Sequence, residues 1–217
     1  VLSSKIMEEA ESLPSHTLDI GGISVTLASA NDQARYGCQD VTGFELWQYA
    51  TVAACERLLG DPSLVRGRHV LELGCGLGAL GIFCAKLGAA QVLFTDKEPD
   101  VLQLAMRNAR ANGISNRCEF AVLDFARGLP LSSGINFDLV VASDVLFLDK
   151  LANPLFRTFE ALSVASTRPL IAVVGHEVRR AVFRGVDGQP QLEDEDTALA
   201  QFLEIAGSAA QVRSAVS

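Results

Sequence analysis

The chain has 217 residues, a formal net charge of −8 and 49% apolar residues, which fits one acidic globular domain with a substantial core. No part of it reaches the ~18 uninterrupted apolar residues of a membrane span, and residues 1–15 lack the basic and apolar segments of a signal peptide. The lysines and arginines are scattered, so we expect no nucleic-acid partner and no membrane partner.

The cysteines and histidines exclude two further classes of site. Five cysteines form no Cys-x-x-Cys pair, and three histidines lie far apart in the sequence. This pattern favours neither a disulfide framework nor a metal centre. Reduced thiols are typical of the cytoplasm, with the nucleus as a second compartment.

Apolar residues recur with the two-residue period of a strand in some segments and with helical spacing in others. Residues 16–30 alternate around a Gly-Gly pair, as in a β-hairpin, and residues 44–60 have helical spacing. After them, strands are predicted at 69–73, 91–96, 118–125, 137–147 and 169–178, and helices at 78–89, 99–113, 151–165 and 196–209. Residues 179–196 are predicted to be a polar loop, and residues 211–217 to begin another strand.

Strands that alternate with helices predict parallel βαβ units with helices on both faces of the sheet. We therefore predict a doubly wound, mostly parallel α/β fold in a single domain over residues 1–217. Residues 1–45 would form an N-terminal hairpin or flap, and residues 46–217 a Rossmann-like core.

A glycine-rich turn follows the first strand of this core. It reads Leu73-Gly74-Cys75-Gly76-Leu77-Gly78, and such a turn lets the backbone approach a ligand closely. Gly74, Gly76 and Ala79 formally match the dinucleotide pattern Gly-x-Gly-x-x-Ala, which leaves an NAD(P)-dependent oxidoreductase as one alternative. However, Glu72 would crowd a pyrophosphate, whereas it suits a cationic ligand such as S-adenosylmethionine, and the chain leaves little room for a second nucleotide-binding half.

Carboxylates follow three further strands, at the edge where open α/β sheets bind ligands. Asp96 would accept hydrogen bonds from ribose hydroxyls, or would cap the next helix. Asp124 and Phe125 would hold an adenine ring, or would be a turn residue and a core residue. Asp144 would face an incoming amine, or would cap the next helical segment.

Two other residues have open roles. Trp47 lies on the helix before the core and would pack there or cover the cofactor, and His176 is assigned no catalytic role. The segment Asp144-Val145-Leu146-Phe147 differs from the Asp-Pro-Pro-aromatic signature of nucleic-acid amino-methyltransferases, which argues further against a nucleic-acid substrate.

Three segments resemble the seven-β-strand protein-lysine methyltransferases, over about Thr42 to Val178. They read VLELGCGLGALGIFCAKLGA, VLFTDKEPDVLQLAMRNARANG and FDLVVASDVLF. The upstream TGFELWQYA is similar to the family's Gly-x-x-x-Trp segment. The resemblance implies a class I methyltransferase fold with a seven-stranded sheet, S-adenosylmethionine as cofactor and a lysine-bearing protein as substrate.

The resemblance also implies roles for single residues. Gly74, Cys75 and Gly76 would contact the methionine moiety, Ser143 would line the cofactor pocket, and Trp47 would contact the cofactor. Asp144 would be catalytic with Phe147, which replaces the tyrosine of the family's Asp-x-x-Tyr motif. A small-molecule acceptor, a histidine or N-terminal acceptor, and a binding module without turnover remain as alternatives.

Overall fold

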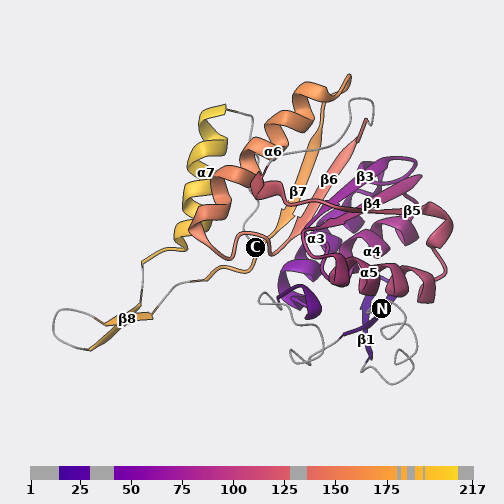
Figure 1. The fold of residues 1–217 in the computed structure, drawn as a ribbon, viewed down its shortest axis with the longest axis horizontal. Coiled ribbons are helices and arrows are strands. Elements are labelled where there is room, and N and C mark those ends of the chain that lie inside the picture. The colour runs from indigo at the N-terminus through magenta and orange to yellow at the C-terminus, as the bar shows by residue number, and fades with distance from the viewer. Residues whose placement is uncertain are drawn as a thin grey trace.

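A five-stranded parallel sheet forms the centre of the computed structural model, which describes residues 15–29, 42–127, 136–179, 182–184, 189–192 and 194–209 (Figure 1). Its strand order is β5-β4-β3-β6-β7. The strands are β3 (His69–Leu73), β4 (Gln91–Asp96), β5 (Cys118–Val122), β6 (Leu139–Ser143) and β7 (Ile171–Gly175). The chain runs outward from β3 to β5 and then returns to β6, so β3 and β6 flank the topological switch point where such sheets bind ligands.

Helices cover both faces of the sheet, which confirms the predicted doubly wound fold (Figure 1). One face carries α3 (Gln48–Gly60), α4 (Ala79–Leu87) and α5 (Pro99–Ala111), and the other carries α6 (Ala152–Ala165) and α7 (Thr197–Ala209). Short 3-10 turns connect these elements: η2 (Thr42–Phe44), η3 (Pro62–Leu64), η4 (Ser115–Arg117), η5 (Phe125–Arg127) and η6 (Asp149–Leu151). In the part of the chain that is described, no helix is long and apolar enough to cross a membrane.

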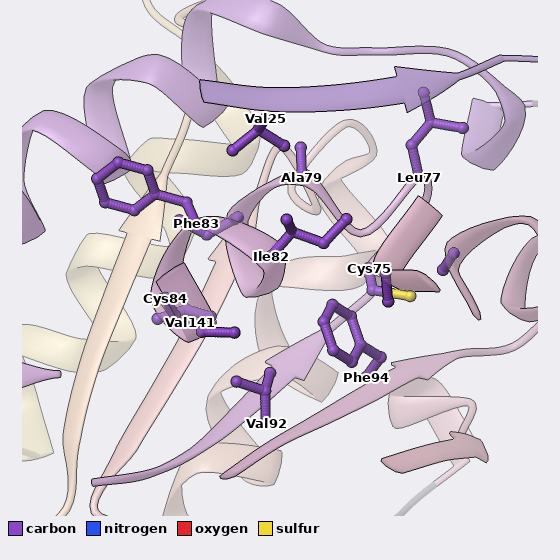
Figure 2. Packing of buried hydrophobic residues seen from close by; sticks show 14 of the residues in the cluster. Val25, Cys75, Leu77, Ala79, Ile82, Phe83, Cys84, Val92, Phe94 and Val141 are labelled. Atoms are coloured by element: carbon purple, nitrogen blue, oxygen red, sulfur yellow. The ribbon is translucent and has the colours of Figure 1, made fainter. Parts of the chain in front are cut away.

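The two faces divide the core between alternate residues of each strand, because successive side chains of a strand point to opposite sides. Val92 and Phe94 of β4 belong to the cluster under α4, whereas Leu93 packs on the side of α6. Figure 2 shows Val92 and Phe94 below Ile82 of α4, with Val25 on the opposite side of that helix. The helix α4 is therefore buried between the sheet and an outer layer.

The resemblance implied seven strands, and the described residues form five in the parallel sheet. The polar segment predicted as a loop contains β8 (Val182–Arg184) and β9 (Pro190–Leu192). These two strands pair with each other in an antiparallel hairpin that lies apart from the sheet, instead of extending it (Figure 1). The strand predicted at residues 211–217 lies outside the described residues.

The helix α3 lies directly on β6 and β7. At Gly175 an added Cβ would lie 2.1 Å from the carbonyl oxygen of Ala50, so only glycine allows this approach. The hydroxyl of Thr51 makes a 2.8 Å hydrogen bond with the hydroxyl of Ser143 at the end of β6. These contacts hold the start of α3 at the carboxyl edge of the sheet.

An N-terminal hairpin of β1 (Ser15–Ile20) and β2 (Ile23–Ala28) forms the outer layer. The buried Asn108 of α5 accepts a hydrogen bond from the Ala28 amide (2.8 Å) and donates to the carbonyl oxygens of Ala28 (3.1 Å) and Leu77 (3.0 Å). One side chain thus joins the hairpin, α5 and the glycine-rich turn. The hairpin packs on α4 and α5, and the segment 30–41 of the predicted flap lies outside the described residues.

Replacing Asn108 with alanine is expected to lower the free energy of unfolding by about 3 kcal/mol, because one buried and two partly buried backbone groups lose their partner. Asn112 provides a matched control, since it bonds the amide and carbonyl of Thr26 in the same manner through hydrogen bonds that are exposed to solvent. Asn112→Ala is expected to lose about 1 kcal/mol or less, since water replaces its bonds. Urea unfolding of both variants measures the difference, and equal losses would contradict the role given to Asn108.

Candidate functional site

A cleft of about 350 Å³ opens at the carboxyl edge of the parallel sheet. It runs from the glycine-rich turn after β3 past the ends of β4 and β5 to the end of β6, and residues 42–47 before α3 form one wall. All the site residues proposed from the sequence line this one cleft: Trp47, Glu72, Gly74, Cys75, Gly76, Asp96, Asp124, Phe125, Ser143, Asp144 and Phe147.

The turn after β3 requires glycine for two separate reasons. Gly76 has a φ of +51°, a left-handed conformation that strains any residue with a Cβ. A Cβ there would also lie 3.4 Å from the carbonyl oxygen of Gly43, in the wall segment before α3. At Gly74, with a φ of +60°, a Cβ would lie 2.9 Å from the side chain of Val145. Backbone rather than side chain therefore faces the cleft at this turn.

Glu72 lies at the base of the cleft and is only 2% exposed. Its Oε2 accepts a 3.1 Å hydrogen bond from the Gly81 amide in the first turns of α4. Burial raises the pKa of this carboxyl well above its usual value, and although the Gly81 amide opposes the shift, the charge of Asp96 adds to it. A carboxyl in such surroundings gains most when a cationic ligand arrives.

Asp96 joins the end of β4 to the glycine-rich turn. Its Oδ2 accepts from the Gly76 amide and its Oδ1 from the Glu98 amide, both at 3.1 Å. Burial raises the pKa of Asp96, and these two amides oppose the shift. The residue that caps α5 is Glu98, so the alternative of Asp96 as the helix cap is wrong.

Asp124 and Phe125 form the wall beyond β5. The Asp124 carboxylate accepts from the Ala126 amide at 3.0 Å and pairs with the Arg127 Nε at 3.2 Å, as a turn residue does. Phe125 packs on the apolar cluster that contains α6, and its ring would lie 4.0 Å from a Cβ at Gly74. The cleft role and the structural role given to this pair are thus compatible.

Trp47 and Phe147 contribute aromatic rings to the lining of the cleft. Each side chain is 38% exposed, which is high for a large hydrophobic residue. The Trp47 indole donates to the carbonyl oxygen of Thr42 at 2.9 Å, so the ring is fixed to the wall segment before α3. Because Phe147 has no hydroxyl, it contributes an apolar surface and no hydrogen bond.

Asp144 has a backbone φ of +58°, which no other non-glycine residue in the described segments shares. Its amide donates to the Gly175 carbonyl oxygen at 2.8 Å, which stabilises this conformation. The residue before η6 is Leu148, so Asp144 does not cap that turn. Strained backbone of this kind is commonly retained at functional sites, where it aims a side chain.

Sequence reasoning missed the partner of Asp144, which is Arg179. The Arg179 Nη1 donates to Oδ1 of Asp144 at 2.6 Å, and Nη2 donates to Oδ2. The hydrogen bond with Asp144 raises the pKa of Arg179 although burial opposes it, so the guanidinium stays charged. Arg179 itself lines the cleft.

His176 lies behind this pair and is buried. Its Nε2 is 2.9 Å from Oδ2 of Asp196, and its Nδ1 is 3.8 Å from Oδ1 of Asp144. Burial of Asp196 would raise its pKa, but the amides of Arg179 and Leu199 and the His176 ring outweigh burial and lower it. The bond between His176 and Asp196 thus links the segment after β7 to the start of α7.

Comparison with known proteins identifies the family. The family model described as lysine methyltransferase matches residues 33–183. The chain belongs to this lysine methyltransferase family. The matched region contains every residue of the cleft, from Thr42 to Arg179.

Two curated methyltransferases are similar to this chain in sequence. The chain is 32% identical over 130 residues to protein N-lysine methyltransferase METTL21A of Danio rerio, covering 58% of each protein. It is 39% identical over 114 residues to ribosomal protein L11 methyltransferase of Methylococcus capsulatus, covering 52% of this chain and 34% of that protein. The chain thus spans well under two thirds of these relatives.

The solved structure of PH0793 from Pyrococcus horikoshii, described as a transferase, has the same fold. It superposes with a TM-score of 0.50 and 17% identity, covering 91% of this chain and 62% of that one. At this identity the likeness supports the doubly wound fold alone.

The cleft of this lysine methyltransferase family member fits S-adenosylmethionine. This cofactor carries a cationic sulfonium and an ammonium group, and the lining is rich in carboxyl groups, which include the buried Glu72. The lining acids are Glu45, Glu72, Asp96, Glu98, Asp124 and Asp144, against the cations Lys97, Lys150 and Arg179. A dinucleotide pyrophosphate would meet this negative charge, so the oxidoreductase alternative is not supported.

Proposed function

We propose that this protein transfers a methyl group from S-adenosylmethionine to the ε-amine of a lysine in a partner protein. The observation that carries the proposal is the single cleft that joins the glycine-rich turn to Asp144, Trp47 and Phe147. A methyl donor held at one end would lie beside an acceptor that enters at the other end. The family match and the likeness to an N-lysine methyltransferase support lysine as the acceptor.

The cofactor would occupy the half of the cleft around β3, β4 and β5. The backbone of the glycine-rich turn would contact the methionine moiety, with the Glu72 carboxyl below it. Each Asp96 oxygen accepts only one backbone hydrogen bond, so both retain a lone pair for the ribose hydroxyls. Asp124 and Phe125 would flank the adenine, and Ser143 and Trp47 would close the pocket.

The cofactor supplies an activated methyl group, whose bond to sulfur breaks as the bond to the lysine nitrogen forms. A lysine amine has a pKa of about 10.4 and must lose its proton to solvent water before attack. The neutral amine is itself the nucleophile, so the residues of the chain have to align it with the methyl group. Trp47 and Phe147 would provide apolar walls around the lysine side chain, and Asp144 would orient its nitrogen.

The activity is tested with methyl-tritiated S-adenosylmethionine and an extract of cells that lack this protein. We expect label in a discrete protein band, and methyl-lysine as the labelled residue after acid hydrolysis. Label in methyl-histidine or at a protein N-terminus would replace lysine as the acceptor. Bound cofactor without any labelled protein would contradict the proposal and favour a small-molecule acceptor or a binding module.

Replacing Asp144 with asparagine is expected to lower the methylation rate about tenfold, because the acceptor nitrogen loses a charge-assisted hydrogen bond worth about 1.5 kcal/mol. Affinity for S-adenosylmethionine should change by less than about twofold. The control is Asp138→Asn at the opposite end of β6, where the buried carboxylate pairs with Arg168 at 2.9 Å. If Asp144→Asn retains the full rate per folded molecule, Asp144 does not act on the acceptor.

A further inference from the structure

The Asp144 carboxylate is fully engaged by the protein's own arginine. Its side chain is only 2% exposed, and both its oxygens accept from the Arg179 guanidinium. The backbone amide of Glu177 lies 3.5 Å from Oδ1 as well. Because the carboxylate is buried beneath the guanidinium, an acceptor nitrogen cannot reach Asp144 while Arg179 holds this position.

The same guanidinium lies over an aromatic ring. The Cζ of Arg179 is 5.5 Å from the centroid of the Trp47 ring. A carboxylate together with an aromatic face is an arrangement that attracts organic cations in general. The position between Asp144 and Trp47 is thus a cation subsite in the wall of the cleft, and an internal side chain occupies it.

Arg179 lies on the cleft side of this arrangement, and its backbone is fixed separately from its side chain. The side chain is 35% exposed, whereas that of Asp144 beneath it is 2% exposed. The Arg179 amide donates to Oδ2 of Asp196 at 2.6 Å, and Asp196 is held in turn by His176. The guanidinium also contacts the carbonyl oxygen and the carboxylate of Glu177, at 3.1 Å and 3.7 Å. It can leave the subsite by a side-chain rotation that breaks these contacts while the backbone stays in place.

We propose that Arg179 is an internal substitute for the cationic side chain of the substrate, which fills the acceptor subsite between Asp144 and Trp47 until the substrate displaces it. This inference rests on the proposed function in one respect, namely that the acceptor is a cationic side chain. Arg179 keeps the buried Asp144 paired when no substrate is bound, which avoids an uncompensated buried charge. When the substrate displaces Arg179, the ion pair between Arg179 and Asp144 is replaced by one between the substrate cation and Asp144.

The proposal predicts that removal of the guanidinium strengthens the binding of an added cation. The probe is N-acetyl-lysine N-methylamide, titrated in the presence of S-adenosylhomocysteine. Trp47 is the only tryptophan of the chain, so its fluorescence reports on the cation above its ring. We expect Arg179→Gln to bind the probe about tenfold more tightly than the unchanged protein, since no internal cation competes for the subsite.

Three controls separate displacement from a change in folding. Arg168→Gln removes another arginine that pairs with a buried aspartate, Asp138, at the other edge of the sheet, and should bind the probe as the unchanged protein does. The uncharged N-acetyl-norleucine N-methylamide should gain no affinity in Arg179→Gln. Binding of S-adenosylhomocysteine by calorimetry checks that each variant is folded, and Arg179→Met serves if the glutamine variant is not.

Unchanged, weaker or undetectable probe binding in a folded Arg179 variant would overturn the proposal. In that case Arg179 is a permanent partner of Asp144. The proposed function fails separately: tight probe binding in the variant without methyl-lysine in the extract would leave the cation subsite intact and reject lysine methylation. Methyl-lysine in the extract with no gain in probe affinity would support lysine methylation and reject the displacement of Arg179.

Discussion

Replacing Gly76 with arginine is expected to abolish binding of S-adenosylmethionine while the chain remains folded. The new side chain would enter the cleft between the glycine-rich turn and the wall segment, where an added Cβ would already touch the Gly43 carbonyl oxygen at 3.4 Å. We expect the affinity measured by calorimetry to fall by more than ~100-fold, or about 2.7 kcal/mol. The left-handed backbone adds only about 1 kcal/mol of strain to the folded state.

Gly113→Arg is the matched control for this substitution. Gly113 also has a left-handed backbone, with a φ of +74°, and a Cβ there would have no atom within 4 Å. The control should carry a similar strain, which thermal unfolding measures, and should bind the cofactor normally. If Gly76→Arg binds S-adenosylmethionine as tightly as Gly113→Arg does, the cofactor does not lie at the glycine-rich turn.

Replacing Glu72 with glutamine is expected to stabilise the free protein and to weaken cofactor binding. The pKa of Glu72 is raised by burial in the folded state, so its contribution to stability is present at low pH and is lost as the pH rises towards the folded pKa. Glutamine carries no charge, so it removes this pH-dependent loss of stability. Its side-chain oxygen can still accept a hydrogen bond from the Gly81 amide. The gain in melting temperature of Glu72→Gln over the unchanged protein should therefore grow as the pH rises above the ordinary pKa of glutamate, about 4.3.

Cofactor affinity should change in the opposite direction, because the ionised Glu72 would pair with the positive charge of S-adenosylmethionine. We expect calorimetry to show about 10-fold to 100-fold weaker binding, which corresponds to the loss of one charge-assisted hydrogen bond. The uncharged 5′-methylthioadenosine serves as the control ligand, and its affinity should hardly change. Equal losses for both ligands would mean that Glu72 acts only through the shape of the glycine-rich turn.

Parts of the fold were predictable because buried parallel strands consist of short apolar runs. The predicted bounds 69–73 and 91–96 are confirmed for β3 and β4, which end at a glycine-rich turn and at an aspartate. The fourth strand was predicted at 137–147, and β6 is shorter, over Leu139–Ser143. It ends there because Asp144 adopts a positive φ, which is rarely adopted by a residue other than glycine.

The cleft was predictable for a similar reason, since the carboxyl ends of parallel strands meet at one edge. Arg179 was missed because it lies 35 residues after Asp144, in a polar segment predicted as a loop. The contact depends on the pairing of β6 with β7, which places Ser143 beside Gly175. The sequence did contain a signal for this contact. If the fourth and fifth predicted strands are neighbours in the sheet, the residues that follow each of them lie close together.

The contacts of α3 have a consequence for how the cleft comes into existence during synthesis. Thr51 bonds to Ser143, 92 residues later, and Ala50 lies against Gly175 in the last strand of the sheet. The wall that carries Trp47 packs on α4 and α5 as well, but its seat on the sheet is complete only after β7 has left the ribosome. Such long-range closure is slow and entropically demanding. A nascent chain that stops before β7 would carry the glycine-rich turn but not the finished cleft, so cofactor binding would mark the completion of folding rather than its beginning.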